Sequence, residues 1–292
     1  MIISKTPYRI SLFGGGTDYS DWYTKNEGDI ISTTINKYIY ITCREIPEFF
    51  NHKHRVVYSI IENVKKTEDI KLNVVREAIK YLKIKNGMEI HYDGDLPAKS
   101  GMGSSSSFVV GILNALNNFV DIKLNKKKLS NKSIMFESKI LKEIVGIQDQ
   151  IAASYGGFNH IKIKKNGKYF VKPIFKKFSD LNELDKRLFL AYTNVKRDNK
   201  FVINYVSKLN SKKKKQMKFI QSSVKLAKDL LKKNQFDSIG ELLHESWVKK
   251  RQLSDIVSNK KLDALYDYGT NSGALGGKLL GAGGGGFGYL TM

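Results

Sequence analysis

Residues 97–108, PAKSGMGSSSSF, carry the clearest chemical signal in the chain. Two glycines flank Met102, four serines follow, and the apolar run from Phe108 has the spacing of a helix. The first N–H groups of a helix lack partners within the helix and lie at the positive end of its dipole, so anions bind there. Gly101 and Gly103 let the backbone curl close to such an anion. The stretch predicts either an anion-binding loop or a polar loop with an ordinary serine cap.

Other phosphate-binding motifs do not fit this loop. A Walker A loop, G-x-x-x-x-G-K-[ST], is absent, because Lys99 precedes the glycines instead of following them. The spacing is not that of a dinucleotide-binding fingerprint either. Serine hydroxyls can donate to a phosphate or ligate Mg²⁺, which takes oxygen ligands. Two further glycine-rich stretches favour anion binding: TPYRISLFGGGTDY at residues 6–19 and GALGGKLLGAGGGGFG at residues 273–288.

The elements that must position these loops are a mixture of strands and helices. Hydrophobic spacing predicts strands over 1–13, 29–46 and 87–96 and helices over 74–84, 104–120 and 132–145. Asn166-Gly167 predicts the turn of a β-hairpin. Residues 199–272 carry mostly Lys-rich helical patterns. We therefore expect an α+β protein with two domains, residues 1–178 and residues 179–292.

Composition excludes several classes of protein. A hydrophobic content of 41% and an aromatic content of 11% indicate a folded chain. No run of 18 apolar residues is present, and the first residues lack the pattern of a signal peptide. The single cysteine, Cys43, leaves no internal disulfide. We expect a cytoplasmic protein without a membrane partner.

The net charge of +22 raises the question of nucleic-acid binding. Only seven of the 50 basic residues are Arg, the side chain best suited to forked phosphate contacts and base edges. The lysines are scattered, with runs only at 126–128 and 212–215. This pattern is typical of solvated faces, so we expect no nucleic-acid partner. The positive field would still help to gather anionic small substrates.

The three glycine-rich stretches, in this order and at this spacing, resemble the motifs of the GHMP small-molecule kinases. The first is similar to the substrate motif of that family, the second to the P-x-x-x-G-[LM]-G-S-S phosphate loop, and the third to the G-A-G-G-G loop that braces it. The stretches GIQDQIAASYGGFN and LLHESWVKK extend the resemblance to the D-glycero-D-manno-heptose 7-phosphate kinases. The first motif of galactokinases reads G-E-H-T-D-Y, and Gly15 and Gly16 of this chain occupy its Glu and His positions. The absence of those two side chains argues against galactose as substrate.

The resemblance implies the GHMP kinase fold. An N-terminal β/α domain would carry the phosphate loop at a helix N-terminus, and a C-terminal domain would be a ferredoxin-like arrangement of helices and sheet. It implies ATP as co-substrate, Mg²⁺ as metal and phosphorylation of the anomeric O1 of a heptose 7-phosphate, for GDP-heptose and surface polysaccharide; homo-oligomerisation is left open. Family members usually continue for several dozen residues after the last glycine loop, whereas this chain ends at Met292, so we expect a truncated C-terminal domain.

Two catalytic residues follow from the resemblance. Asp149, in GIQDQ, matches the aspartate that accepts the O1 proton, although a carboxylate at a helix N-terminus would explain the same sequence. Arg9 stands where the family keeps a basic residue beside that aspartate. There it would hold Asp149 ionised and stabilise charge on the transferring phosphoryl group. The stretch YRISLF alone would make Arg9 a residue on a strand surface.

The resemblance also implies ligands for Mg²⁺ and for the phosphates of ATP. Glu137 lies twelve residues before Asp149, at the spacing of the family's metal-binding glutamate, and Glu143 is its competitor. We choose Ser105 as the serine ligand, with Ser104 and Ser106 as close alternatives. The implied phosphate-binding set is Lys99, Gly101, Met102, Gly103, Ser104, Ser105 and Ser106.

The sugar is expected to contact the first motif. Asp18 would accept hydrogen bonds from sugar hydroxyls; it is also a candidate helix N-cap, and the two roles are compatible. Arg55, in NHKHRVVYS, would hold the second phosphate of the substrate, and a solvated basic turn explains it nearly as well. The implied substrate-binding set is Gly15, Gly16, Thr17, Asp18, Arg55, Gly283 and Gly284. Two other functions stay open: a GHMP kinase for another sugar or sugar phosphate, and a non-catalytic relative that binds sugar.

Overall fold

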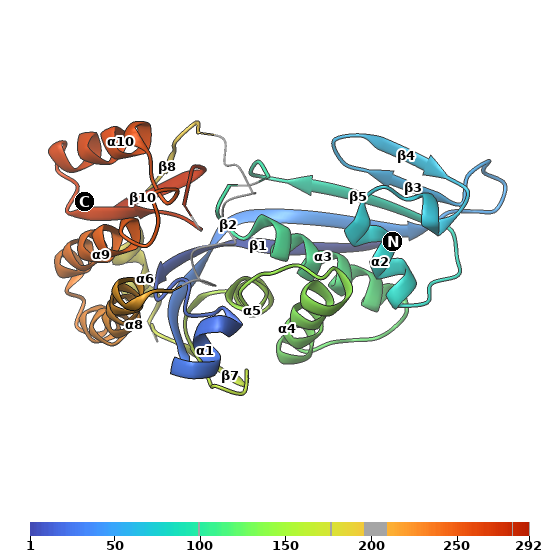
Figure 1. Cartoon of the computed structure of the whole chain (residues 1–292). Coiled ribbons are helices and arrows are strands. Elements are labelled where there is room, and N and C mark those ends of the chain that lie inside the picture. Colours follow the sequence, from blue (N-terminus) through green and yellow to red (C-terminus); the bar gives the residue numbers. More distant parts are fainter. Residues whose placement is uncertain (99, 176, 196–208, 282, 292) are drawn as a thin grey trace. The chain divides into compact units, whose positions relative to one another are not determined.

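The computed structural model in Figure 1 describes the chain except for residues 99, 176, 196–208, 282 and 292. The chain forms two compact units, each assembled from separate stretches. Unit 1 comprises Met1–Tyr8, Ile35–Ala98 and Ser104–Gly156, and unit 2 comprises Arg9–Thr34, Lys99–Gly103 and Gly157–Met292. The domain boundary near residue 178 stays a prediction.

Unit 1 contains a sheet with strand order β4-β3-β5-β2. The later part of β2 (Gly28–Glu45) pairs antiparallel with β5 (Met88–Gly94), from Ile39 opposite Gly94 to Glu45 opposite Met88. β3 (His54–Val57) runs parallel to β5 and antiparallel to β4 (Ile61–Val64), and β1 (Ile2–Phe13) pairs with β2. The strands predicted over 1–13, 29–46 and 87–96 are confirmed. They form because their Ile, Val, Thr and Tyr side chains suit a pleated, half-buried surface.

The helices of unit 1 are α2 (Asn73–Tyr81), α3 (Ser104–Phe119), α4 (Lys126–Met135) and α5 (Gln148–Tyr155), with a 3₁₀ turn, η1 (Thr67–Asp69), and a π turn, η2 (Phe136–Ile140). α3 packs closely on the strands of unit 1 (Figure 1). A Cβ on Gly111 of α3 would lie 3.0 Å from Thr6 Oγ1 and 3.2 Å from Ile41 Cγ1, so the close approach requires glycine. The ring of Phe108 lies 4.7 Å from the ring of Tyr92 in β5. The helices predicted over 74–84 and 104–120 are confirmed within a few residues.

The helix predicted over 132–145 has the wrong bounds. It begins earlier, at Lys126, because the Asn125 side chain caps it by accepting from the backbone N–H of Lys128 at 2.8 Å. Its end is a π turn, in which the N–H of Leu141 donates to the carbonyl of Phe136 at 2.9 Å. Such turns interrupt helices and occur often at functional sites. Hydrophobic spacing could predict neither the cap nor the π turn.

The strands of unit 2 form a hairpin and a small sheet. The first part of β2 pairs with β6 (Phe158–Ile163), and β6 pairs with β7 (Tyr169–Pro173), all antiparallel. Gly167 lies in the β6–β7 turn with a φ of +78°, which glycine adopts without strain, so the predicted hairpin is confirmed. The small sheet has the antiparallel order β8-β10-β9, formed by β8 (Leu188–Tyr192), β10 (Phe287–Thr291) and β9 (Gly276–Leu279).

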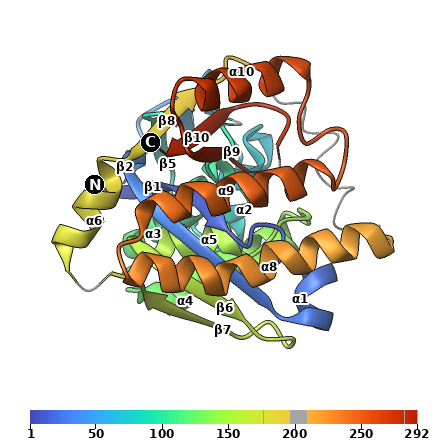
Figure 2. The ribbon, with the colours of Figure 1, turned by 90° about the vertical axis from the view of Figure 1, so that its left-hand side faces the viewer.

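The helices of unit 2 are α1 (Ser20–Asn26), α6 (Phe178–Asp185), α8 (Ser211–Lys232), α9 (Phe236–Arg251) and α10 (Lys260–Asn271). α8 and α9 lie side by side, as Figure 2 shows, and α9 packs on β9 and β10. A Cβ on Gly240 of α9 would lie 2.5 Å from Thr291 Oγ1 of β10, so glycine permits this packing. The helical prediction for the Lys-rich region is confirmed over its described part, from residue 209; residues 199–208 lie outside the described ranges.

No helix in the described ranges has an apolar stretch long enough to cross a membrane.

Candidate functional site

Two of the three glycine-rich stretches meet in unit 2. The N–H of Phe287 donates to the Ser100 carbonyl at 3.1 Å, which joins the third stretch to the second. A Cβ on Gly101 would lie 2.8 Å from the Leu280 carbonyl oxygen, and one on Gly286 would overlap the Ser100 carbonyl oxygen. Backbone packs directly on backbone, which only glycine allows. The expected bracing of the second loop by the third is confirmed.

Gly286→Ala is expected to destabilise the protein more than Gly273→Ala. Both residues have a positive φ, +93° and +104°, so a side chain strains each backbone by about 1–3 kcal/mol. No atom lies within 4 Å of a Cβ on Gly273, whereas a Cβ on Gly286 would overlap a carbonyl of the second loop. In Gly286→Ala, overpacking should add roughly 2 kcal/mol to the loss in free energy of unfolding. Each kcal/mol lowers the melting temperature by roughly 2–4 °C. Thermal unfolding of the two variants measures the difference, and equal losses would show that the two loops are not packed as described.

Gly283 and Gly284 pack on Val257 of the same unit. The N–H of Gly284 donates to the Val257 carbonyl at 3.0 Å, and a Cβ on Gly283 would lie 2.5 Å from that oxygen. Both have positive φ, +102° for Gly283 and +78° for Gly284. Their described contacts therefore shape the third loop, and their role as substrate ligands stays a prediction.

Arg9 stabilises the second loop by hydrogen bonds to its backbone. Its side chain is only 6% exposed, and Nη1 donates to the Gly101 carbonyl at 2.7 Å. Its backbone N–H donates to the Met102 carbonyl at 3.1 Å. The alternative in which Arg9 lies on a strand surface is therefore wrong. Arg9 belongs to unit 2 and Asp149 to unit 1, so the pairing of the two side chains stays a prediction.

Lys278 of β9 is a buried lysine, affected by the charge of Arg9, that the sequence interpretation missed. It is buried, and its Nζ donates to the Leu12 carbonyl of β1 at 3.0 Å. Burial, with a smaller effect from the charge of Arg9, lowers the pKa of Lys278 to about 7. The side chain ties β9 to the strand that carries Arg9. A lone lysine among the small and apolar residues of GGKLL is the signal that could have indicated it.

The first glycine-rich stretch forms a tight turn at the end of β1. Thr17 is fully buried and its hydroxyl donates to the Gly14 carbonyl at 2.7 Å. The N–H of Gly16 donates to Asp18 Oδ1 at 3.1 Å, and the Asp18 side chain is 6% exposed. The N-cap of α1 is Tyr19, so the alternative in which Asp18 caps that helix is wrong. Gly15, next to Gly16, is half-buried.

Unit 1 contains a buried carboxylate beside the start of α3. Glu137, in the π turn, is fully buried, and the Ser106 hydroxyl lies 3.0 Å from each of its carboxylate oxygens. The Gln150 amide of α5 also donates to it. Burial raises the pKa of Glu137 to about 8; the hydrogen bonds from Gln150 and Ser106 oppose this shift, and the charges of Glu143 and Asp149 add to it. The protein alone therefore favours the protonated form of Glu137 at neutral pH.

Ser106, not Ser105, is the serine at Glu137. α3 begins at Ser104, and each residue turns about 100° around the helix axis, so adjacent serines face different ways. Ser104 is half-buried, Ser105 is exposed, and Ser106 is buried against Glu137. Glu143, the competitor of Glu137, is exposed in the loop that follows the π turn. Four identical serines carry no sequence signal that could have fixed this register.

Asp149 lies in the first turn of α5 and is half-buried. It is close enough to Glu137 for its charge to raise the pKa of that carboxyl. Unit 1 thus places a second, more accessible carboxylate near the buried pair of Ser106 and Glu137. Within the described residues, no group of three or more His, Cys, Asp and Glu side chains is arranged to hold a metal ion.

Arg55 has a partner within the protein. It lies on β3, with Nε 3.7 Å from Glu89 Oε1, and its side chain is 40% exposed. Glu89 also pairs with Arg44, and with His91 at 2.9 Å. Hydrogen bonding from His91, followed by Arg44, lowers the pKa of Glu89. The proposed contact of Arg55 with a substrate phosphate would have to compete with this carboxylate, and it stays a prediction.

His54, next to Arg55, serves the fold. It is fully buried, and its Nδ1 accepts from the N–H of Met88 at 3.2 Å. Its Nε2 lies 2.9 Å from the Thr67 hydroxyl. Burial lowers the pKa of His54 to about 4, so the ring is neutral at physiological pH. One of the four basic residues of NHKHRVVYS is therefore not available to an anion. Lys99, at the other predicted phosphate site, lies outside the described residues.

Comparison with known proteins identifies the family of the chain. The family model of the GHMP kinases N-terminal domain matches residues 73–157, and that of the GHMP kinases C-terminal domain matches residues 227–291. The D-glycero-alpha-D-manno-heptose 7-phosphate kinase of Campylobacter jejuni is 31% identical over an alignment that covers 100% of this chain and 89% of the relative.

Solved structures of kinases also superpose on this chain. The crystal structure of a D-glycero-D-manno-heptose 1-phosphate kinase from Bacteriodes thetaiotaomicron superposes with a TM-score of 0.81 at 26% identity, covering 100% of this chain and 88% of that one. A putative sugar kinase from Campylobacter jejuni superposes with a TM-score of 0.76 at 28% identity, with the same coverage. These matches show that the chain belongs to the GHMP kinase family and is an ATP-dependent sugar kinase with the GHMP kinase fold.

Proposed function

We propose that this kinase transfers the γ-phosphoryl group of ATP to the anomeric O1 of D-glycero-D-manno-heptose 7-phosphate, which gives the 1,7-bisphosphate and ADP. The observation that carries the proposal is the buried pair of Ser106 and Glu137 beside the more accessible Asp149. Oxygen donors and a separate base are the two kinds of group that phosphoryl transfer requires from a protein. The choice of sugar follows the name of the Campylobacter relative.

In the proposed reaction Asp149 is the general base. Its carboxylate accepts the proton of the O1 hydroxyl as the bond from O1 to the γ-phosphorus forms and the bond from that phosphorus to the β–γ bridging oxygen breaks. Arg9 stabilises the negative charge on the transferring group. Asp18 and the backbone of Gly16 and Thr17 orient the sugar through its hydroxyls. A sugar held in this way presents one hydroxyl to the base.

The second loop and the first turn of α3 hold the phosphates of ATP. Gly101, Met102 and Gly103 supply backbone donors, and positive φ values of +83° and +70° at the two glycines shape the loop. Ser104 and Ser105 add hydroxyl donors, and Lys99 adds a cation. The positive end of the α3 dipole favours the same charge.

The oxygen donors at Glu137 fit Mg²⁺. This ion binds through one or two carboxylates together with substrate phosphates and water. Glu137 is buried, and none of the donors in its described hydrogen bonds is a cationic side chain. The side-chain carbonyl oxygen of Gln150, in the same cluster, is buried without a hydrogen-bond partner. Glu137 and Ser106 would hold Mg²⁺, which supplies charge neutralisation for the phosphates when bound. Ser106 thus replaces Ser105 as the proposed serine ligand.

The substrate preference can be tested by ADP release with Mg·ATP in the cytoplasmic pH range. We expect kcat/KM for heptose 7-phosphate to exceed that for the unphosphorylated heptose, mannose and galactose by about 10²-fold or more, because a site built to pair its cations with a phosphate discriminates against sugars that lack it. Heptose 1-phosphate belongs in the same series, since one structural neighbour is described as a heptose 1-phosphate kinase. Preference for another sugar would overturn the assigned substrate, and no turnover with any sugar would favour a sugar-binding role without catalysis.

A further inference from the structure

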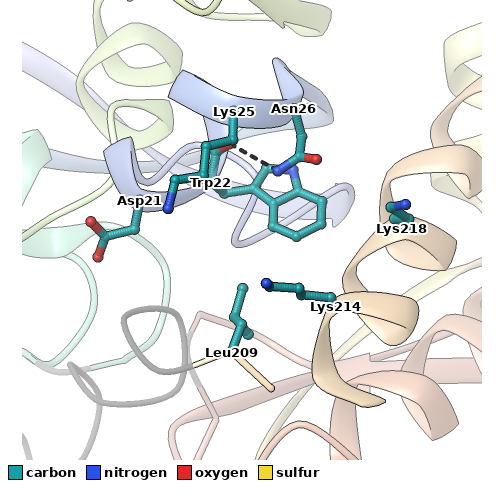
Figure 3. Close-up of a pocket in the computed structure, with 7 residues that line it drawn as sticks. All are labelled: Asp21, Trp22, Lys25, Asn26, Leu209, Lys214 and Lys218. Atoms are coloured by element: carbon teal, nitrogen blue, oxygen red, sulfur yellow. Dashed lines mark hydrogen bonds between the residues drawn. The ribbon is translucent and has the colours of Figure 1, made fainter. Parts of the chain in front are cut away.

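We propose that a pocket between α1 and the start of α8 binds a phosphate monoester, and that in the proposed reaction this is the phosphate remote from the reacting O1. The identity of the molecule that carries the phosphate rests on the proposed function; the affinity of the pocket for phosphate does not. The pocket belongs to unit 2 and has a volume of about 360 Å³ (Figure 3). It is lined by Asp21, Trp22, Lys25, Asn26, Leu209, Lys214 and Lys218.

A rigid base supports the pocket. The Trp22 side chain is 2% exposed and packs with Met217 and Ile220 of α8 and with Leu253. Its Nε1 donates to the Gln221 side chain at 3.1 Å, and the Gln221 amide donates back to the Asn26 carbonyl of α1 at 3.2 Å. α1 is therefore fixed to α8 by an apolar cluster and by hydrogen bonds in both directions. The two helices therefore hold the backbone of the rim lysines, Lys25, Lys214 and Lys218, in fixed positions.

The charge of the pocket fits an anion. Lys25 comes from α1, and Lys214 and Lys218 are four residues apart on one side of α8. The lining residues therefore carry three ammonium groups and one carboxylate, that of Asp21. Figure 3 shows Lys214 extending into the space beneath the ring of Trp22, with Lys25 on the α1 side. Among the described residues, no carboxylate lies within ion-pair distance of these three lysines. A phosphate monoester would neutralise most of this excess charge.

The first turn of α8 adds to the same field. α8 is 22 residues long, and its N-cap, Asn210, accepts from the N–H of Lys213 at 2.9 Å. The positive end of the helix dipole therefore lies beside the lysines of the pocket. Lys214 and Lys218 thus combine a place at a pocket with a buried aromatic base and a place near the N-terminus of a long helix. The lysine run at 212–215, which composition alone assigned to a solvated face, thus contributes one side chain to a cavity.

The pocket is linked to the predicted sugar ligand through α1. Asp18 precedes this helix by two residues, and Tyr23, the neighbour of Trp22, is near enough to Asp18 for the carboxylate to add to the rise in its pKa caused by burial. A sugar bound by Asp18 would therefore lie near the start of α1, the helix that supplies Lys25 to the pocket. The lysines of the pocket also lack the carboxylate that engages Arg55, so they are the better candidates for a remote phosphate.

Binding can be tested first without any sugar. Titration of the full chain with inorganic phosphate, followed by ³¹P NMR, should give saturable binding. The double variant Lys25→Gln/Lys214→Gln should weaken it by about tenfold or more. The control is Lys212→Gln/Lys215→Gln, which removes the same charge from exposed positions outside the pocket. Equal weakening by both double variants would show that only the general positive field attracts phosphate and would overturn the proposal.

Kinetics then separates the pocket from the proposed function. The double variant Lys25→Gln/Lys214→Gln should raise KM for heptose 7-phosphate by about tenfold or more, with kcat and the KM for the unphosphorylated heptose within about twofold. An unchanged KM for the 7-phosphate would overturn the proposal while the kinase function stands, and a rise in KM for Arg55→Gln instead would place the phosphate at Arg55. Phosphate binding that depends on Lys25 and Lys214, without turnover of the heptose, would overturn the assigned substrate. The same result would still support the pocket as a phosphate-binding site.

Discussion

Asp149→Asn is expected to lower kcat by about 10²–10⁴-fold, the range that a positioned general base contributes. The amide is nearly isosteric with the carboxylate but cannot accept the O1 proton. KM for ATP and for the sugar should change by less than about threefold, since the base acts on the transition state and not on binding. The rate of ADP release at saturating substrates measures kcat.

The matched control for this variant is Glu143→Gln. It removes one carboxylate from an exposed loop position of the same unit, and Glu143, like Asp149, adds its charge to the environment of Glu137. A change of electrostatic field alone should therefore affect both variants alike. If Asp149→Asn lost less than about tenfold in kcat, or no more than Glu143→Gln, Asp149 would not be the base.

Glu137→Gln should remove the part of the pH dependence of stability that Glu137 contributes. It should also remove most of the activity. Burial raises the pKa of Glu137 to about 8 from 4.5 in the unfolded chain, so between these values the folded protein binds the extra proton. Without Mg²⁺, the stability contribution of Glu137 is therefore complete below about pH 4.5 and is lost as the pH rises through about 8. The full loss is of the order of 5 kcal/mol, at 1.36 kcal/mol per pKa unit.

Thermal unfolding near pH 6 and near pH 9 tests this dependence. The wild type should lose more stability than Glu137→Gln over this interval, and Mg²⁺ should restore the wild type most at the higher pH, because the metal takes the place of the proton. Glu137→Gln should lower kcat by about 10²-fold or more, since a neutral amide is a weaker ligand for Mg²⁺. An identical pH dependence in both proteins would show that Glu137 is not the titrating group.

The comparison must be made between variants because Lys278 acts in the opposite direction. Its pKa is lowered by burial to about 7 from 10.5 in the unfolded chain, so its contribution to stability rises with pH between these values. The wild-type profile contains both effects. The difference between wild type and Glu137→Gln contains only the part due to Glu137, provided that the two groups, which lie in different units, titrate independently.

Strong local patterns in the sequence predicted much of the fold. The helix over 104–120 and the hairpin at Gly167 are both present, because an apolar run behind a serine cap and an Asn-Gly pair each satisfy local backbone requirements. The glycine-rich stretches also predicted the contact of the third loop with the second. The helix over 132–145 failed because its start depends on one Asn cap and its end on a π turn.

The site was predictable only in its residue types. The glycine loops, Glu137 and Asp149 stand out by motif, but the choice between Ser105 and Ser106 depends on the helical register at the first turn of α3. Lys278 is significant because it is buried near Arg9, and burial of a single lysine leaves no periodic signal. The pocket depends on the packing of Trp22 against α8, a contact between residues about 200 positions apart, which one sequence does not reveal.

The identity of the product tests the central claim most directly. We would incubate the enzyme with Mg·ATP and heptose 7-phosphate, follow the reaction by ³¹P NMR, and use Asp149→Asn as the blank. The proposal predicts ADP and a second sugar phosphorus signal that is coupled to the anomeric proton, in equal amounts, with the 7-phosphate signal retained and almost no product from the variant. A new phosphate at another carbon, or only ADP and inorganic phosphate, would contradict the assignment of O1 as the acceptor.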